Sequence, residues 1–141
     1  MGSDSFVSDV DIRGGMDHVA MNAFLSEPVL ARIATIRGDW PHVAPMWFDW
    51  DGEKIRFTHT NKRQKFRNIA ANPNVSMSII DPDNEYRYLE VRGVVEEIVP
   101  DPTGAFYLEL NDRYSGPLTE PPPDAADRVI LIVRPTAFSQ K

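Results

Sequence analysis

Turn signals divide the chain into short segments whose residues have high β propensity. Gly38-Asp39, Asp51-Gly52 and Pro82-Asp83-Asn84 each lie between two such segments, which is the pattern of antiparallel hairpins. Parallel strands need connections of a dozen or more residues, so connections this short favour antiparallel pairing. The chain is therefore expected to be mainly β.

Six segments have the length and composition of strands, and three others have those of short helices. The strands are expected at residues 29–37, 42–50, 54–60, 75–81, 87–99 and 128–134, and the helices at 17–26, 61–72 and 103–114. Gly93 inside the fifth strand predicts a bulge or a sharp bend. Asn61 is expected to cap the second helix, whose buried side would be formed by Phe66, Ile69 and Ala70. This set of elements is typical of a closed or partly open barrel.

Residues 1–15 are polar and Gly-rich, so we expect a flexible leader before a single domain at 16–141. No segment approaches the ~20 apolar residues that a membrane-spanning helix needs, and no membrane association is expected. The chain has no cysteine, which fits a reducing compartment and leads us to expect a cytoplasmic protein. Its formal net charge of -6 argues against nucleic-acid binding, because neutralising phosphates requires a basic surface.

The basic residues are concentrated at one place despite this acidic balance. Four of the fifteen Lys and Arg residues fall between Lys62 and Arg67, at the start of the second expected helix. Cations are unfavourable in the first turn of a helix, where the dipole is positive, unless an anion binds there and neutralises them. A phosphate group is the natural candidate. The alternative is a solvated basic face that pairs with acidic neighbours.

Polar residues near this helix start could contact the same anion. Thr58 and Thr60 share the polar face of the third expected strand, opposite Ile55, Phe57 and His59, and both carry hydroxyl groups. Asn68 lies one turn after Lys65 on a similar side of the helix.

Other kinds of site have little support in the sequence. His18, His42 and His59 are too scattered for a metal motif, and no nucleophile elbow, phosphate-binding loop or dinucleotide fingerprint is present. Alternation places Phe48 and Trp50 on one face of their strand, where core packing is expected, and Trp47 on the other.

The segment Lys65-Phe66-Arg67-Asn68, followed by Asn72-Pro73, and the earlier segment from Pro41 to Phe48 resemble the pyridoxamine 5'-phosphate oxidase-like superfamily. Within it, the chain looks most similar to the actinobacterial deazaflavin-dependent branch. The resemblance implies a six-stranded split β-barrel with a few short α-helices. It also implies that the cofactor phosphate lies on Thr58, Thr60, Arg63, Lys65 and Asn68, and the cofactor ring beside His42, Pro45, Met46 and Trp47. One departure is the first hairpin turn, which reads Gly38-Asp39-Trp40-Pro41.

The resemblance implies an oxidoreductase that uses the deazaflavin F420 and transfers hydride to a small unsaturated or quinone-like acceptor, without a catalytic residue or metal from the protein. The extra cations Arg56 and Lys62 would meet the acidic tail of F420. An FMN-dependent reductase or oxidase is the alternative within enzymes, and a non-catalytic barrel that holds a tetrapyrrole or a cofactor is the alternative outside them. A homodimer with its sites along the subunit interface is expected.

Overall fold

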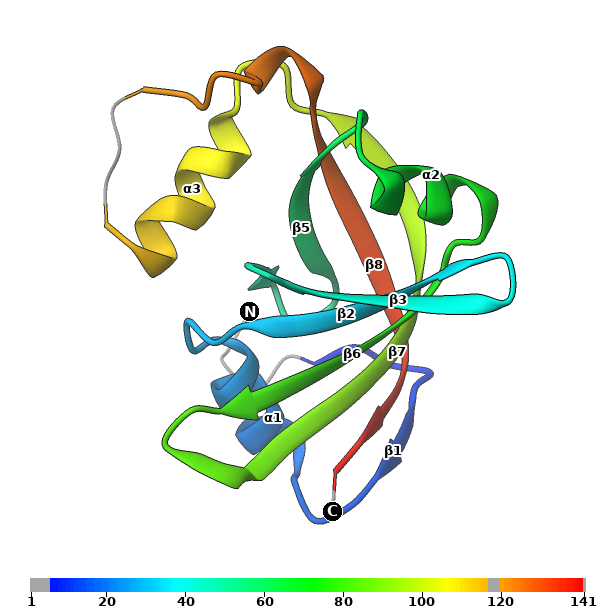
Figure 1. Cartoon of the computed structure of the whole chain (residues 1–141). Helices are drawn as coiled ribbons and strands as arrows, with labels where there is room; N and C mark the ends of the chain where they lie inside the picture. The colour runs from blue at the N-terminus through cyan, green and yellow to red at the C-terminus, as the bar shows by residue number, and fades with distance from the viewer. Residues whose placement is uncertain (1–5, 117–119, 141) are drawn as a thin grey trace.

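The computed structural model describes residues 6–116 and 120–140, and the strands in these ranges form one curved sheet (Figure 1). The sheet order is β3-β2-β6-β7-β8-β5-β4, and β1 pairs with β8 outside this path. Every pairing is antiparallel except that of β1 with β8. β3 and β4 end the order without pairing with each other, so the barrel is split between them.

The elements lie close to where the sequence predicts them. The strands are β1 (Asp11–Arg13), β2 (Ala31–Arg37), β3 (Trp40–Met46), β4 (Asp49–Trp50), β5 (Ile55–Thr60), β6 (Asn74–Asp81), β7 (Asn84–Pro100) and β8 (Arg128–Ser139). The helices are α1 (His18–Leu25), α2 (Gln64–Ala71), α3 (Ala105–Tyr114) and the 3₁₀ turn η1 (Ala125–Asp127). The mainly β split barrel is confirmed. Eight strands replace the expected six, because the second expected strand is interrupted to give β3 and β4, and because β1 was not expected.

The predicted flexible leader is wrong for its second half. Asp11–Arg13 forms β1, in parallel register with residues 137–139 of β8. The apolar side chains near it pack against the core, and they are Phe6, Val7, Val10 and Ile12. These four residues bury apolar surface that a leader would leave in water, which explains why the segment joins the sheet. Residues 1–5 lie outside the described residues.

Gly93 marks a bulge, as predicted. The register of β7 against β8 shifts between Arg92 and Gly93 and again between Val95 and Glu97. The extra residues let this long strand bend and continue from one side of the barrel to the other. Its inward residues, with those of β2, β5, β6 and β8, surround a core that contains Phe48, Phe57 and Phe138.

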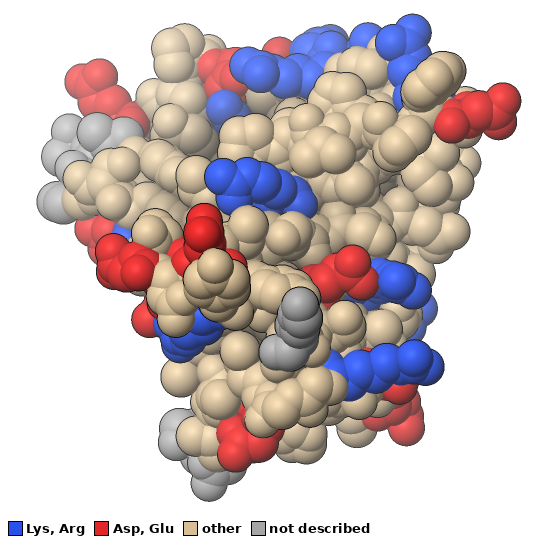
Figure 2. Space-filling view, turned by 60° about the horizontal axis from the view of Figure 1, so that its bottom comes forward, with Lys and Arg blue, Asp and Glu red and all other residues tan. Residues whose placement is uncertain are grey.

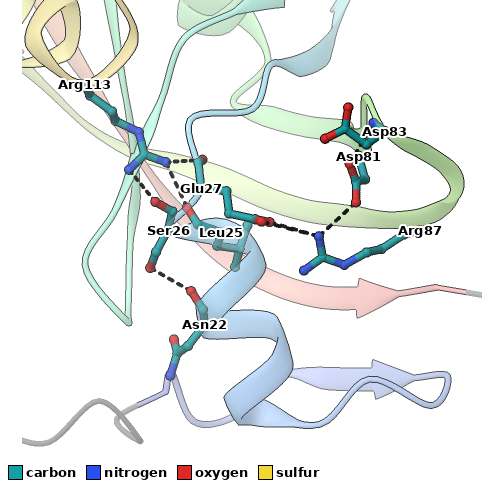
Figure 3. A network of polar contacts seen from close by, with 8 residues as sticks. All are labelled: Asn22, Leu25, Ser26, Glu27, Asp81, Asp83, Arg87 and Arg113. Carbon is teal, nitrogen blue, oxygen red and sulfur yellow. Dashed lines mark hydrogen bonds and ion pairs between the residues drawn. The ribbon is translucent and has the colours of Figure 1, made fainter. Parts of the chain in front are cut away.

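α1 and α3 are joined by a polar network (Figure 3). The guanidinium of Arg113, near the end of α3, donates hydrogen bonds to the carbonyl oxygens of Leu25, Ser26 and Glu27 at 3.1, 3.0 and 2.6 Å. These carbonyls belong to the last residue of α1 and to the two residues after it, where no further helical N–H groups are available to them. The Glu27 carboxylate accepts from Arg87 of β7, which also pairs with Asp81. The network therefore holds the end of α3 against α1 and β7.

Among the described residues, no helix combines the length and the apolar character needed to cross a membrane.

Candidate functional site

The turn from β5 into α2 has an uncapped helix start. The predicted cap at Asn61 is wrong: its backbone N–H donates to the Asp127 carbonyl at 3.0 Å, and Arg63 occupies the cap position without a side-chain hydrogen bond to the helix. No acidic residue lies in the first turn. The first N–H groups of α2 thus keep the partial positive charge that binds anions.

The buried side of α2 is more polar than predicted. Lys65, Asn68 and Ile69 are buried, Phe66 is half-buried, and Ala70 is exposed, so the expected place of Ala70 in the buried stripe is wrong. Lys65, Asn68 and Ile69 are spaced i, i+3 and i+4, so they lie on the one side of α2 that faces the sheet. Ala70 lies outside this side and faces solvent.

Lys65 is a nearly buried residue with a charged group. The residue is only 8 % exposed, and within the described residues no hydrogen bond or ion pair engages its ammonium group. Burial, and next the nearby charge of Arg63, lower the pKa of Lys65 from its ordinary value. Proteins seldom bury a charge without a partner, so the position calls for an anion from outside the chain.

His59 faces the same region from the inward side of β5. It is 7 % exposed, and its Nε2 atom is buried without a hydrogen-bond partner in the described residues. Burial, followed by the charges of Lys65, Arg63 and Arg128, lowers the pKa of His59 to about 4. The charges of Lys65, Arg63 and Arg128 therefore act on His59 together, and they form a basic cluster near it. His59 is a site residue that the sequence suggests only as a metal ligand, although alternation puts it on one face with Ile55 and Phe57.

Arg128, at the start of β8, is a further cation that sequence reasoning missed. It lies opposite Thr60 in the register of β5 and β8, and its Nη1 donates to Thr58 Oγ1 at 3.5 Å. Asp124 pairs with it at 3.0 Å, and its guanidinium lies 4.7 Å from the centre of the Tyr107 ring. Arg128 reaches the site because β8 pairs with β5. It is more than sixty residues away from the other cations of the site in the sequence, so no local sequence pattern indicates its role.

An open pocket of about 360 Å³ reaches Thr58, whose hydroxyl oxygen accepts from Arg128. Its lining residues come from the loop before β2, the end of β3 and β5, and they are Leu30, Pro45, Met46, Trp47 and Thr58. Four of the five are predicted site residues, and Leu30 is new. The lining is apolar apart from Thr58, which also contacts Arg128. The pocket thus offers apolar walls next to a cationic end, which suits a planar ring that carries a phosphate.

Other predicted site residues lie apart from the pocket lining. Asn68 is buried and already engaged, since it accepts from Gln64 Nε2 at 2.8 Å and donates to Thr35 Oγ1 at 3.3 Å. His42 is exposed on β3, opposite Thr35 in the register of β2 and β3. Thr60 is buried at the end of β5, and Arg63 is exposed at the start of α2.

The described residues contain no group of three His, Cys, Asp or Glu side chains that could hold a metal ion.

Comparison with known proteins relates this chain to one family. The family model described as pyridoxamine 5'-phosphate oxidase matches residues 18–141. A solved structure named F420 reductase is 70 % identical, with a TM-score of 0.82, over 84 % of this chain and 95 % of the other. No curated protein matches the chain.

More distant solved structures share the fold. A conserved hypothetical protein from Mycobacterium tuberculosis is 24 % identical, with a TM-score of 0.69, over 95 % of this chain and 87 % of its own. An FAD-binding protein from Mesorhizobium loti is 17 % identical, with a TM-score of 0.61, over 82 % of this chain and 87 % of its own.

Proposed function

The chain belongs to the pyridoxamine 5'-phosphate oxidase family, and from this we propose that it is an oxidoreductase that uses the deazaflavin F420. The observation that carries the proposal is the 70 % identity to the structure named F420 reductase, over 95 % of that chain. The acceptor in the proposal is a small unsaturated or quinone-like molecule.

The residues of the site fit such a cofactor. Lys65 and Arg63, with the uncapped N–H groups of α2, would hold the phosphate, and His59 lies close enough to respond to its charge. Pro45, Met46 and Trp47 would form the wall along the ring, and Thr58 joins the two regions. F420, when bound, supplies hydride transfer at a ring carbon.

The protein itself then acts by binding and orientation. The proposal requires no nucleophile from the chain, because the cofactor supplies the hydride chemistry. The residues of the chain would position the ring and restrict water around it. Leu30 is 41 % exposed at the edge of the pocket, so an acceptor could reach the ring from the open side. Acceptor shape would be selected by these apolar walls and not by a charged group.

Of the two cations expected to favour F420 over FMN, Arg56 and Lys62, one already has a partner in the structure. Arg56 is engaged by Asp49 through two hydrogen bonds of 3.0 and 2.6 Å, so it is less available to the acidic tail of F420 than the sequence suggested. Lys62 is exposed at the helix start and is the better candidate, since Arg63 is assigned to the phosphate. Lys62 would attract the tail through charge-assisted hydrogen bonds.

Titration of the protein with F420 and with FMN, followed by calorimetry and absorption, tests the proposal. We expect F420 to bind more tightly, and the protein to oxidise reduced F420 in the presence of a simple naphthoquinone. FMN affinity equal to or better than that of F420 would favour the FMN-dependent alternative. Tight cofactor binding without turnover of any acceptor tried would favour a non-catalytic carrier.

A further inference from the structure

Trp47 lines the pocket and packs against Tyr114, which is not a lining residue. Its indole is stacked on the ring of Tyr114, the last residue of α3, with 5.0 Å between ring centres and 4° between ring planes. Trp47 stands between β3 and β4, where the chain has no ladder partner to fix its backbone. Its orientation therefore depends on side-chain contacts.

The hydroxyl of Tyr114 also fixes the backbone on either side of the pocket lining. It accepts from the Phe48 N–H at 3.2 Å and donates to the Val29 carbonyl at 2.7 Å, with the Phe48 carbonyl at 3.1 Å. Val29 precedes the lining residue Leu30, and Phe48 follows Trp47. One hydroxyl thus joins the two segments that carry these lining residues.

Tyr114 is itself held in place by its neighbour. Arg113 donates to the three carbonyls of residues 25–27 (Figure 3). Its guanidinium also lies 5.5 Å from the centre of the Phe48 ring. The end of α3 is consequently anchored to α1 and to the core before any ligand binds.

We propose that Tyr114 is a positioning residue for the ring ligand, acting through Trp47. By stacking on the indole and joining the backbone of residues 29 and 48, it holds Trp47 as a ready-made flat wall. Ordering a large side chain during binding costs affinity, and a wall ordered in advance avoids that cost. The inference rests on the proposed function to the extent that the ligand is F420 or FMN.

Affinity measurements on four variants test the proposal, with F420 and FMN as probes. Tyr114→Leu removes the stack and the hydroxyl, and should weaken binding roughly 5- to 10-fold, the scale of one newly immobilised side chain. Tyr114→Phe keeps the ring and should restore most of the affinity. Trp47→Leu should weaken binding at least as much, and the double variant no more than Trp47→Leu by itself, because Tyr114 acts through Trp47. Tyr86→Phe, at an exposed tyrosine on β7, is the matched control.

A second measurement needs no ligand. In protein labelled with 5-fluorotryptophan, the fluorine resonance of Trp47, assigned from its loss in Trp47→Phe, should shift and broaden in Tyr114→Leu, while that of exposed Trp40 stays unchanged. Unaltered affinity in Tyr114→Leu, additive losses in the double variant, or an unchanged Trp47 resonance would each overturn the proposal. If Tyr114→Leu does not fold, an unchanged Trp47 resonance in Tyr114→Phe overturns it, because loss of the hydroxyl that bonds Phe48 and Val29 should still shift that resonance. Failure of the wild-type protein to bind F420 or FMN would instead count against the proposed function.

Discussion

Lys65 is only 8 % exposed at the start of α2, and no carboxylate of the described residues neutralises its ammonium group. Folding therefore opposes its charged form, as its lowered pKa indicates. A bound phosphate would reverse this balance, because it supplies both the counter-charge and hydrogen-bond acceptors. Replacing Lys65 should consequently raise the stability of the ligand-free protein and lower its affinity for the ligand.

We predict that Lys65→Met stabilises the ligand-free protein but weakens F420 binding by about 1.5 to 3 kcal/mol, the scale of a charge-assisted hydrogen bond. Arg63→Ala should weaken binding by a similar amount with little change in stability, since Arg63 is exposed. Thermal unfolding without ligand and calorimetry with ligand measure the two effects. Arg92→Ala, which removes an exposed cation elsewhere, is the control. Normal binding by both site variants would place the phosphate elsewhere.

His59 should make stability depend on pH below neutrality. Its pKa is about 4 in the folded protein, against 6.5 for the ordinary group, so between these values the unfolded chain binds a proton that the folded chain does not. The free energy of unfolding should then fall as pH drops from 6.5 to 4, by at most about 3 kcal/mol from this residue, and level off below. This loss should be absent in His59→Gln.

Chemical denaturation of the wild type and of His59→Gln at pH 7 and pH 4.5 measures the effect. The exposed His42 provides the control, because His42→Gln should keep the wild-type pH dependence. Bound phosphate or F420 should also raise the pKa of His59, which NMR titration would detect. Equal pH dependence in wild type and His59→Gln would contradict the prediction.

At the scale of elements, β7 and β8 approach each other so closely at Gly93 that no side chain fits. A Cβ atom placed there would lie 2.7 Å from the Arg134 carbonyl oxygen and 2.7 Å from Val133 Cγ1. Gly93→Ala should lower the free energy of unfolding by about 1 to 3 kcal/mol through overpacking at the bulge. Gly15→Ala, where a Cβ meets nothing within 4 Å, should change stability little and serves as the control. Urea denaturation compares the two, and equal stabilities would show that the strands can separate without cost.

The elements were predictable where local pattern and packing agree. The alternation of β5 correctly put Ile55, Phe57 and His59 on one face, which the structure buries, and the turn at Asp51-Gly52 marked the start of the strand. β1 was missed because its few apolar residues gain burial only against β8, which lies more than a hundred residues away in the chain. The same applies to Arg128 and Leu30: pairing and loop packing bring them to the site, and no local pattern reports either.

The site was predictable as two groups of residues but not as one surface. The crowding of cations before Arg67 pointed to an anion at α2, and the segment from Pro41 to Phe48 resembled a ring wall. Their connection through Thr58 and Arg128 depends on the sheet order that places β8 beside β5. For Asn68 the local pattern instead predicted a contact that the structure does not support. Its spacing from Lys65 suggested a ligand contact, whereas its amide is hydrogen-bonded to Gln64 and Thr35.

At the scale of the whole molecule, charge is mixed on the surface while apolar residues collect at the split in the barrel. Figure 2 shows acidic and basic side chains interspersed over the lower part of one face. Some of the charged residues form ion pairs, such as that of Arg87 with Asp81. β3, at one end of the sheet order, leaves Trp40 78 % and Val43 61 % exposed. An unpaired edge strand with exposed apolar side chains is a common site of association between chains.

We therefore predict a homodimer that covers β3 and places the open side of the pocket along the interface. A chain of 141 residues buries limited surface on folding, and pairing would remove Trp40 and Val43 from water. Sedimentation at micromolar concentration should give twice the 16.0 kDa mass of one chain. Val43→Glu should shift the protein toward monomer and weaken F420 binding together, because burying a charge in the interface is costly and the pocket would lose its cover. Tyr86→Glu, at another exposed position, should change neither property. A single species of 16.0 kDa that binds cofactor at full stoichiometry would contradict the prediction, since each chain would then form a complete site without its copy.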